Sequence, residues 1–215
     1  MQAARTVTAH PSATLLARFA AVALLLATAV ACTTVMQSAE VVAPGQVAVG
    51  LGGAVGLPNG VGFGGGAAYV RVGVADRLDM GFKAEGPVPL IFTLDAKYQV
   101  VRADRFLVAA DLGIAYFIPA SDLGVVAMAL AGTDRWYGGV RVTAGAPSAG
   151  SEFNILPEVV AGVSFGDRLR VLGEAQFVAP SLSLPTDGGA ATWQVDQLAV
   201  KLGVALQLMI GEPKT

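Results

Sequence analysis

Apolar and polar residues alternate along most of the chain after residue 45, with the period of two that is typical of half-buried β-strands. In one clear example, Phe92, Leu94, Ala96, Tyr98 and Val100 share one face, and Thr93, Asp95, Lys97 and Gln99 share the other. The pattern predicts strands over residues 46–57, 61–74, 78–86, 90–101, 106–118, 123–132, 136–144, 153–165, 169–178 and 194–209.

A short polar pair, Asp-Arg followed by a large apolar residue, recurs between these segments. Successive copies are 28, 30 and 33 residues apart, which is the length of two strands and one connection. Because Asp favours tight turns by bonding its own backbone, we interpret the pairs as hairpin turns rather than as ligands. Their residues are Asp76, Arg77, Asp104, Arg105, Asp134, Arg135, Asp167 and Arg168.

The remaining connections contain proline and alternate strictly with the Asp-Arg turns, which predicts an up-and-down meander with an even number of strands. These prolines are Pro58, Pro87, Pro89, Pro119, Pro147, Pro180 and Pro185. The longest predicted connections, 145–152 and 179–193, belong to this second class. Outer-membrane barrels have short periplasmic turns and longer external loops. The Asp-Arg turns are therefore predicted to face the periplasm.

The polar face of the predicted strands is rich in small residues, which suits a crowded, concave interior. On the first strand it consists of Gln46, Ala48, Gly50, Gly52, Ala54 and Gly56. Glycine also lets strands coil enough to close a sheet. We therefore expect an all-β protein, an up-and-down antiparallel transmembrane β-barrel of about ten strands, with eight as the other count. A soluble sandwich or a lipocalin-like barrel is the alternative.

Composition supports the membrane interpretation, because 54% of the residues are hydrophobic and only 14% are charged. Soluble domains carry about 25% charged residues. After residue 31 there is no uninterrupted apolar run near 18 residues, so no transmembrane helix is predicted. The net charge of -2 and the lack of a basic cluster predict no nucleic-acid partner.

The first 31 residues have the features of a signal peptide, with Arg5 and Arg18 before an apolar stretch that ends at Ala31. Cys32, the only cysteine, follows directly, and its setting resembles the lipobox of bacterial lipoproteins. Ordinary cleavage after Ala31 is the alternative. The predicted organisation is a signal peptide (1–31), a tether from a lipidated Cys32 (32–45), a β-barrel (46–210) and a C-terminal tail (211–215).

Catalytic chemistry is poorly represented. The only histidine, His10, lies in the predicted signal peptide, which leaves no histidine for a triad, a zinc site or a general base. The sequence contains neither a Gly-x-Ser-x-Gly motif nor a phosphate-binding loop. We expect no enzyme, no cofactor and no metal site.

Charged residues on the polar face are predicted to point into the lumen, in equal numbers of acids and bases. A salt-bridged interior that fills a narrow barrel is the favoured interpretation, since unpaired charges in a confined space are costly. A small-solute pore is the alternative. These residues are Arg71, Asp79, Lys83, Glu85, Asp95, Lys97, Asp111, Arg141, Glu158, Arg170, Glu174 and Lys201.

Over residues 46–210 the chain resembles the small bacterial outer-membrane β-barrel proteins with the OmpA-type architecture. The resemblance implies an outer-membrane location with membrane lipid as a partner, and a structural or passive small-solute transport role. The chain departs from such barrels at its end, which is Leu208 to Thr215 rather than an aromatic residue. A periplasmic lipoprotein barrel that binds an apolar ligand is the alternative, and it would need an apolar lumen and a polar exterior.

Overall fold

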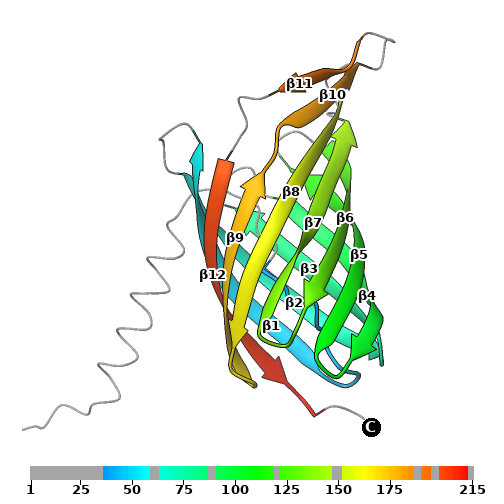
Figure 1. The fold of residues 1–215 in the computed structure, drawn as a ribbon, viewed down its shortest axis with the longest axis vertical. Helices are drawn as coiled ribbons and strands as arrows, with labels where there is room; N and C mark the ends of the chain where they lie inside the picture. The colour runs from blue at the N-terminus through cyan, green and yellow to red at the C-terminus, as the bar shows by residue number, and fades with distance from the viewer. Residues whose placement is uncertain are drawn as a thin grey trace, which may run out of the picture.

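The computed structural model describes residues 36–58, 63–86, 91–118, 122–146, 152–185, 190–194 and 199–212. Its ten long strands form a closed antiparallel barrel (Figure 1). The barrel strands are β1 (Val47–Pro58), β2 (Phe63–Ala75), β3 (Leu78–Gly86), β4 (Ile91–Ala103), β5 (Phe106–Phe117), β6 (Asp122–Gly132), β7 (Trp136–Ala146), β8 (Glu152–Phe165), β9 (Leu169–Val178) and β12 (Ala199–Ile210).

The barrel closes because β12 pairs with β9 on one side and with β1 on the other. Every other barrel strand pairs with its neighbours in the sequence, so the connectivity is up-and-down throughout. Both the all-β class and the count of about ten strands are therefore confirmed. The predicted signal peptide, Cys32 and most of the proline-bearing connections lie outside the described residues.

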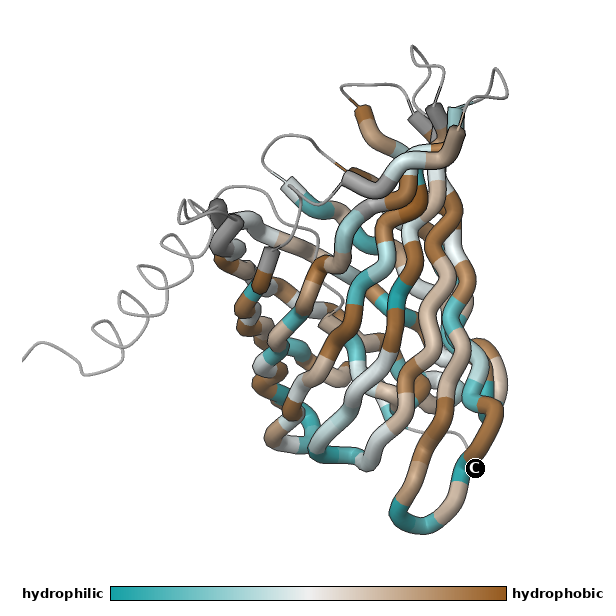
Figure 2. The backbone as a smooth tube through the Cα atoms, turned by 45° about the horizontal axis from the view of Figure 1, so that its top comes forward, coloured by the Kyte–Doolittle hydropathy of each residue, from teal (hydrophilic) through white to brown (hydrophobic). Residues whose placement is uncertain are grey.

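Alternating residues of the strands point into the lumen and away from the barrel, as the pattern predicts. On β4, Thr93, Lys97 and Gln99 are buried in the lumen, whereas Leu94 and Tyr98 are about half exposed on the outside. Figure 2 shows the same alternation of hydrophobic and hydrophilic positions along the wall. The wall thus buries its polar face and exposes its apolar face.

The four Asp-Arg turns lie at one end of the barrel, which we call the turn end. Two of them are two-residue turns, after Ala75 and after Ala103, and two have a third residue, Thr133 or Gly166. Gly166 has a φ of 94°, a conformation that glycine adopts without steric cost. The start of β1 and the end of β12 pair at this same end, where Met209 N–H donates to the carbonyl of Arg168.

Two short strands lie where a connection was predicted over residues 179–193. They are β10 (Ser181–Pro185) and β11 (Thr192–Gln194), and they form a hairpin beyond the barrel, at the end opposite the turns (Figure 1). β8 extends past β9, and β10 pairs with its first four residues. The last barrel strand accordingly begins at Ala199 rather than at the predicted residue 194.

The most important difference from the sequence analysis concerns residues 36–45, which were predicted to be a tether. We call them the lumen segment, because they run inside the barrel and reach the turn end just before β1 begins. Met36, Ala39, Val41 and Val42 are all buried there. Pro44 pairs with Gly73 of β2 in a single parallel bridge, so the segment joins the sheet only at its end.

Candidate functional site

The inner wall carries the charged residues that were predicted to face the lumen. All of them are buried except Arg170, whose side chain is 19% exposed at the turn end. The buried ones are Arg71, Asp79, Lys83, Glu85, Asp95, Lys97, Asp111, Arg141, Glu158, Glu174 and Lys201.

Opposite charges occupy neighbouring positions in one row around the wall. The row starts at Asp79 on β3 and continues through Lys97 and Asp111 on the next two strands. After Met128 it ends with Arg141 and Glu158 on β7 and β8. Residues directly opposite each other on adjacent strands interact, so the alternation of sign favours this register.

An ion cluster centred on Arg71 lies nearest the turn end. Its Nη2 atom is 2.6 Å from Asp79 Oδ1, 2.7 Å from Asp95 Oδ1 and 3.8 Å from Asp111 Oδ2. Arg71 Nε also donates to Asp79 Oδ1 over 3.0 Å, and Lys97 Nζ lies 3.5 Å from Asp79 Oδ2. We call these five residues the Arg71 cluster. Charge-assisted hydrogen bonds, which are stronger than neutral ones, join Arg71 to Asp79, and the other contacts of the cluster are ion pairs.

Further ion pairs close the lumen on the side away from the turns. Glu158 joins two strands, because its Oε1 accepts from Lys201 Nζ at 2.8 Å and its Oε2 lies 3.4 Å from Arg141 Nη1. Lys83 and Glu85 pair on β3 at 3.1 Å. These pairs support the predicted salt-bridged interior.

Two tyrosines fill lumen space that glycines leave open. A Cβ atom at Gly50 would lie 2.1 Å from the ring of Tyr69, and one at Gly162 would lie 2.3 Å from the ring of Tyr137. Tyr137 also donates from its hydroxyl to Glu174 Oε2 over 3.0 Å. These glycines are therefore required for packing, and they explain part of the small-residue face seen in the sequence.

The wall binds the lumen segment largely through the main chain of the segment. Val42 N–H donates to Asp79 Oδ2 over 2.8 Å, and Met36 N–H donates to Glu174 Oε2 over 3.0 Å. In the other direction, Lys97 Nζ donates to the carbonyls of Ser38 and Glu40 over 3.1 and 2.6 Å.

Two side chains of the segment, Gln37 and Glu40, add polar contacts. Gln37 Nε2 donates to Asp111 Oδ2 over 2.7 Å, deep in the lumen. Near the turn end, Arg170 Nη1 donates to Glu40 Oε2 over 2.6 Å. The second pair is partly exposed and contributes less, because solvent screens it.

Glycines on the wall leave room for the segment itself. A Cβ atom at Gly73 would lie 2.0 Å from the carbonyl oxygen of Ala43, and one at Gly203 would lie 2.5 Å from Met36 Cε. The clash at Gly73 involves backbone and cannot be relieved by a rotamer change. The wall is thus shaped around the segment as well as charged toward it.

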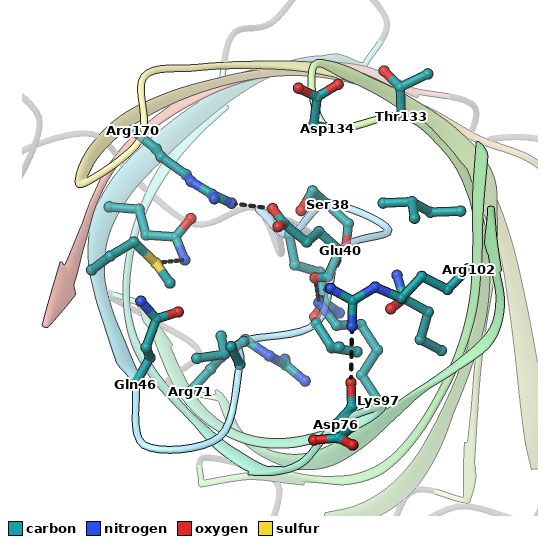
Figure 3. A pocket seen from close by; sticks show the side chains of 18 of the residues that line it. Ser38, Glu40, Gln46, Arg71, Asp76, Lys97, Arg102, Thr133, Asp134 and Arg170 are labelled. Carbon is teal, nitrogen blue, oxygen red and sulfur yellow. Dashed lines mark hydrogen bonds and ion pairs between the residues drawn. The ribbon is translucent and has the colours of Figure 1, made fainter. Parts of the chain in front are cut away.

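A polar cavity of about 500 Å³ opens at the turn end, and the lumen segment forms part of its lining. Figure 3 shows Ser38 and Glu40 in the middle of the ring of strands, with Arg170 extending from the wall toward Glu40. Arg102 donates to the carbonyl of Asp76 at the rim, over 3.4 Å. Acidic and basic groups are mixed around this cavity, which gives it no single ligand chemistry.

Sequence reasoning placed the wall charges inside but missed the lumen segment. The segment has no strand periodicity that the sequence could show. Its position inside the barrel is set by contacts with residues far away in the chain. Its only signals were its small residues, Ser38, Ala39 and Ala43, and the single charged residue Glu40. Such a composition is equally typical of an exposed linker.

Among the described residues, no three or more His, Cys, Asp or Glu side chains are arranged to hold a metal ion. The same part of the chain contains no helix long and apolar enough to cross a membrane.

Neither the known protein families nor the curated proteins contain a match to the chain. Among solved structures, it is similar to OccD1 (OprD) in a Y282R/D307H form, with 9% identity, a TM-score of 0.29 and coverage of 76% of this chain and 65% of that one. It is also similar to Pseudomonas aeruginosa OpdQ, with 8% identity, a TM-score of 0.28 and coverage of 73% and 58%.

A bacterial polysaccharide outer membrane secretin matches with 8% identity and a TM-score of 0.30, over 79% of this chain and all of that one. The chain spans less than two thirds of the length of OccD1 and of OpdQ. Similarities of this size carry no argument about function. The function is therefore argued from the structure of the barrel itself.

Proposed function

We propose that the protein is an outer-membrane β-barrel whose wall is embedded in lipid and whose lumen can be closed by its own residues 36–45. In this view its role is structural, or it is a small-solute channel that is closed in the present state. The observation that supports the proposal best is the outer surface of the wall.

Every barrel strand exposes large apolar side chains on its outer face. Their exposed fractions reach 63% at Leu112 and 65% at Leu123, values that would be unfavourable in water over so continuous a surface. One such residue from each strand in turn is Val49, Val72, Met80, Leu94, Leu112, Leu123, Val140, Val159, Val171 and Leu202.

The height of this apolar surface matches a membrane. On β12, alternate residues from Val200 to Ile210 are exposed and apolar. Ten residue steps at about 3.3 Å, tilted by about 40°, cover roughly 25 Å along the barrel axis. The outward apolar band of outer-membrane barrels has about the same height.

Exposed charges are confined to the ends of the wall in the part of the chain that the structure describes. They belong to the Asp-Arg turns, to Arg102 beside them and to Glu212 after the last strand. The aromatic residues Phe106, Trp136 and Phe165 are exposed close to the turns, where an interfacial girdle would lie. The alternative, an apolar lumen with a polar exterior, requires the reverse arrangement.

Orientation and anchoring complete the proposal. The turn end faces the periplasm, because outer-membrane barrels keep their short turns on that side. Cys32 carries a lipid, as its lipobox-like setting indicates, although this residue lies outside the described part of the chain.

The proposal is tested by extracting the protein with detergent and comparing its electrophoretic mobility before and after heating. A folded transmembrane barrel is expected to shift on heating and to need detergent for solubility. A protein that shows no shift and stays soluble without detergent would not be a membrane barrel. In planar bilayers, low conductance is expected of the wild-type chain refolded without an acyl group, since the lumen segment and the ion pairs then fill the lumen.

A further inference from the structure

The lumen segment is held in the way that a binding site holds a peptide. We propose that the lumen is a binding channel for a short peptide segment with a small residue near its middle, and that residues 36–45 are its own ligand, able to leave and to bind again. This inference rests on the proposed function and identifies the ligand of the same site.

Recognition in the channel is directed at groups that every peptide possesses. The wall accepts from two main-chain N–H groups, of Met36 and Val42, through buried carboxylates. It donates to main-chain carbonyls through Lys97 and, over 3.5 Å, through Gln99 to Ala39. Main-chain hydrogen bonds provide affinity in other peptide-binding sites, while pockets for side chains provide specificity.

Specificity for a small side chain at position 39 follows from the space around it. Ala39 is completely buried, and it packs in one apolar cluster with Met36, Leu130 and Tyr137. Gly73 lies against the backbone of the segment and leaves no room for a side chain between the two. A bulky residue at position 39 would therefore prevent docking.

Release of the segment would not leave the wall without partners. Asp79 would still pair with Arg71 and with Lys97, and Glu174 would still accept the hydrogen bond from the hydroxyl of Tyr137. A buried charge is strongly destabilising only when its partner is lost, so each of these groups tolerates an empty channel better than an isolated charge would. The barrel is thus built to persist with the segment either docked or displaced.

The test uses the full chain refolded into detergent micelles, together with a fluorescent synthetic peptide of residues 36–45. The refolded chain carries no acyl group on Cys32. Ala39→Trp is designed to displace the segment and leave the wall unchanged. Ala110→Trp is the matched control, because Ala110 is exposed on the outer face of β5. A heat-induced mobility shift verifies that each variant contains a folded barrel.

Saturable binding of the peptide is expected for Ala39→Trp only, measured by fluorescence polarisation. The wild-type chain and Ala110→Trp should bind at least tenfold more weakly, because their channels are already occupied. A peptide N-methylated at Val42 lacks the N–H that donates to Asp79, so its binding to Ala39→Trp should be at least tenfold weaker.

A folded Ala39→Trp barrel that does not bind the peptide would overturn the inference. Equal binding to all three proteins would also overturn it, since the site would then lie outside the lumen. Either result would leave the membrane barrel intact, whereas a wild-type chain without a heat shift and without a need for detergent would refute the proposed function itself.

Discussion

The substitution Asp79→Ala tests the interior of the barrel most sharply. The carboxylate of Asp79 is fully buried, and it accepts two hydrogen bonds from Arg71 and one from the main chain of Val42. It also lies 3.5 Å from Lys97. The substitution therefore leaves two buried cations with fewer partners and also removes one anchor of the lumen segment.

The expected cost follows from the contacts that remain. Removing one partner of a buried ion pair costs about 3–5 kcal/mol. Arg71 still contacts Asp95 at 2.7 Å, and Lys97 still donates to two carbonyls of the segment. The loss should thus lie at the lower end, about 3 kcal/mol in the free energy of unfolding.

Urea unfolding of the protein in lipid vesicles, followed by tryptophan fluorescence, measures this change. With a slope of about 1–3 kcal/mol per molar urea, the midpoint should fall by roughly 1–3 M. Asp104→Ala is the control, because Asp104 is exposed in a turn and substitutions at such sites usually stay within about 0.5 kcal/mol. If Asp79→Ala were as stable as this control, Asp79 would not lie in a dry, ion-paired interior.

Three further predictions concern the packing, the rim and the anchor of the barrel. Gly162→Ala should destabilise the barrel by about 1–3 kcal/mol, because its Cβ would lie 2.3 Å from the Tyr137 ring. Gly173→Ala, whose Cβ would meet its nearest neighbour at 3.4 Å, should have little effect in the same urea titration. Glu40→Gln should change the free energy of unfolding by less than about 1 kcal/mol, since the ion pair of Glu40 with Arg170 is partly exposed. A larger loss would mean that this pair lies in a dry site. Acylation of Cys32 in the periplasmic leaflet should oppose docking of the lumen segment. The four residue steps from Cys32 to Met36 span at most about 14 Å. Met36 lies beside Gly203, about 18 Å from the turn end along β12, so the lipid and the docked segment are too far apart. Acylated protein should therefore bind the labelled peptide more strongly than Cys32→Ser, and equal binding would contradict this reach argument.

The strand pattern could be predicted from the sequence because each strand carries its own signal. The alternation around Leu94 and Lys97 depends only on residues two apart, and the Asp-Arg turns mark where four of the hairpins reverse. These local signals were sufficient for the barrel and for the strand count.

Contacts between distant residues were beyond the reach of such patterns. Val42 and Asp79 are 37 residues apart, and Met36 and Glu174 are 138 residues apart, so no periodicity connects them. The hairpin of β10 and β11 was missed for a similar reason. β10 has only five residues and ends at Pro185, and it is stabilised by the overhanging start of β8.

The role of the wall glycines was only partly predictable. A run of small residues indicates a crowded interior, but it does not say what fills the space. Gly50 makes room for the side chain of Tyr69, whereas Gly73 makes room for the backbone at Ala43. A backbone partner such as Ala43 exists only because the lumen segment lies inside the barrel, which the strand pattern does not indicate.

The central claim, that the apolar exterior faces lipid, is tested most directly by a single tryptophan at position 112. Leu112 is 63% exposed on the outer face of β5, so Leu112→Trp in a chain with Trp136→Phe and Trp193→Phe reports on its surroundings. In vesicles, the account predicts strong quenching by lipids brominated near the bilayer centre and little quenching by aqueous acrylamide. Quenching by acrylamide and not by the brominated lipids would contradict it.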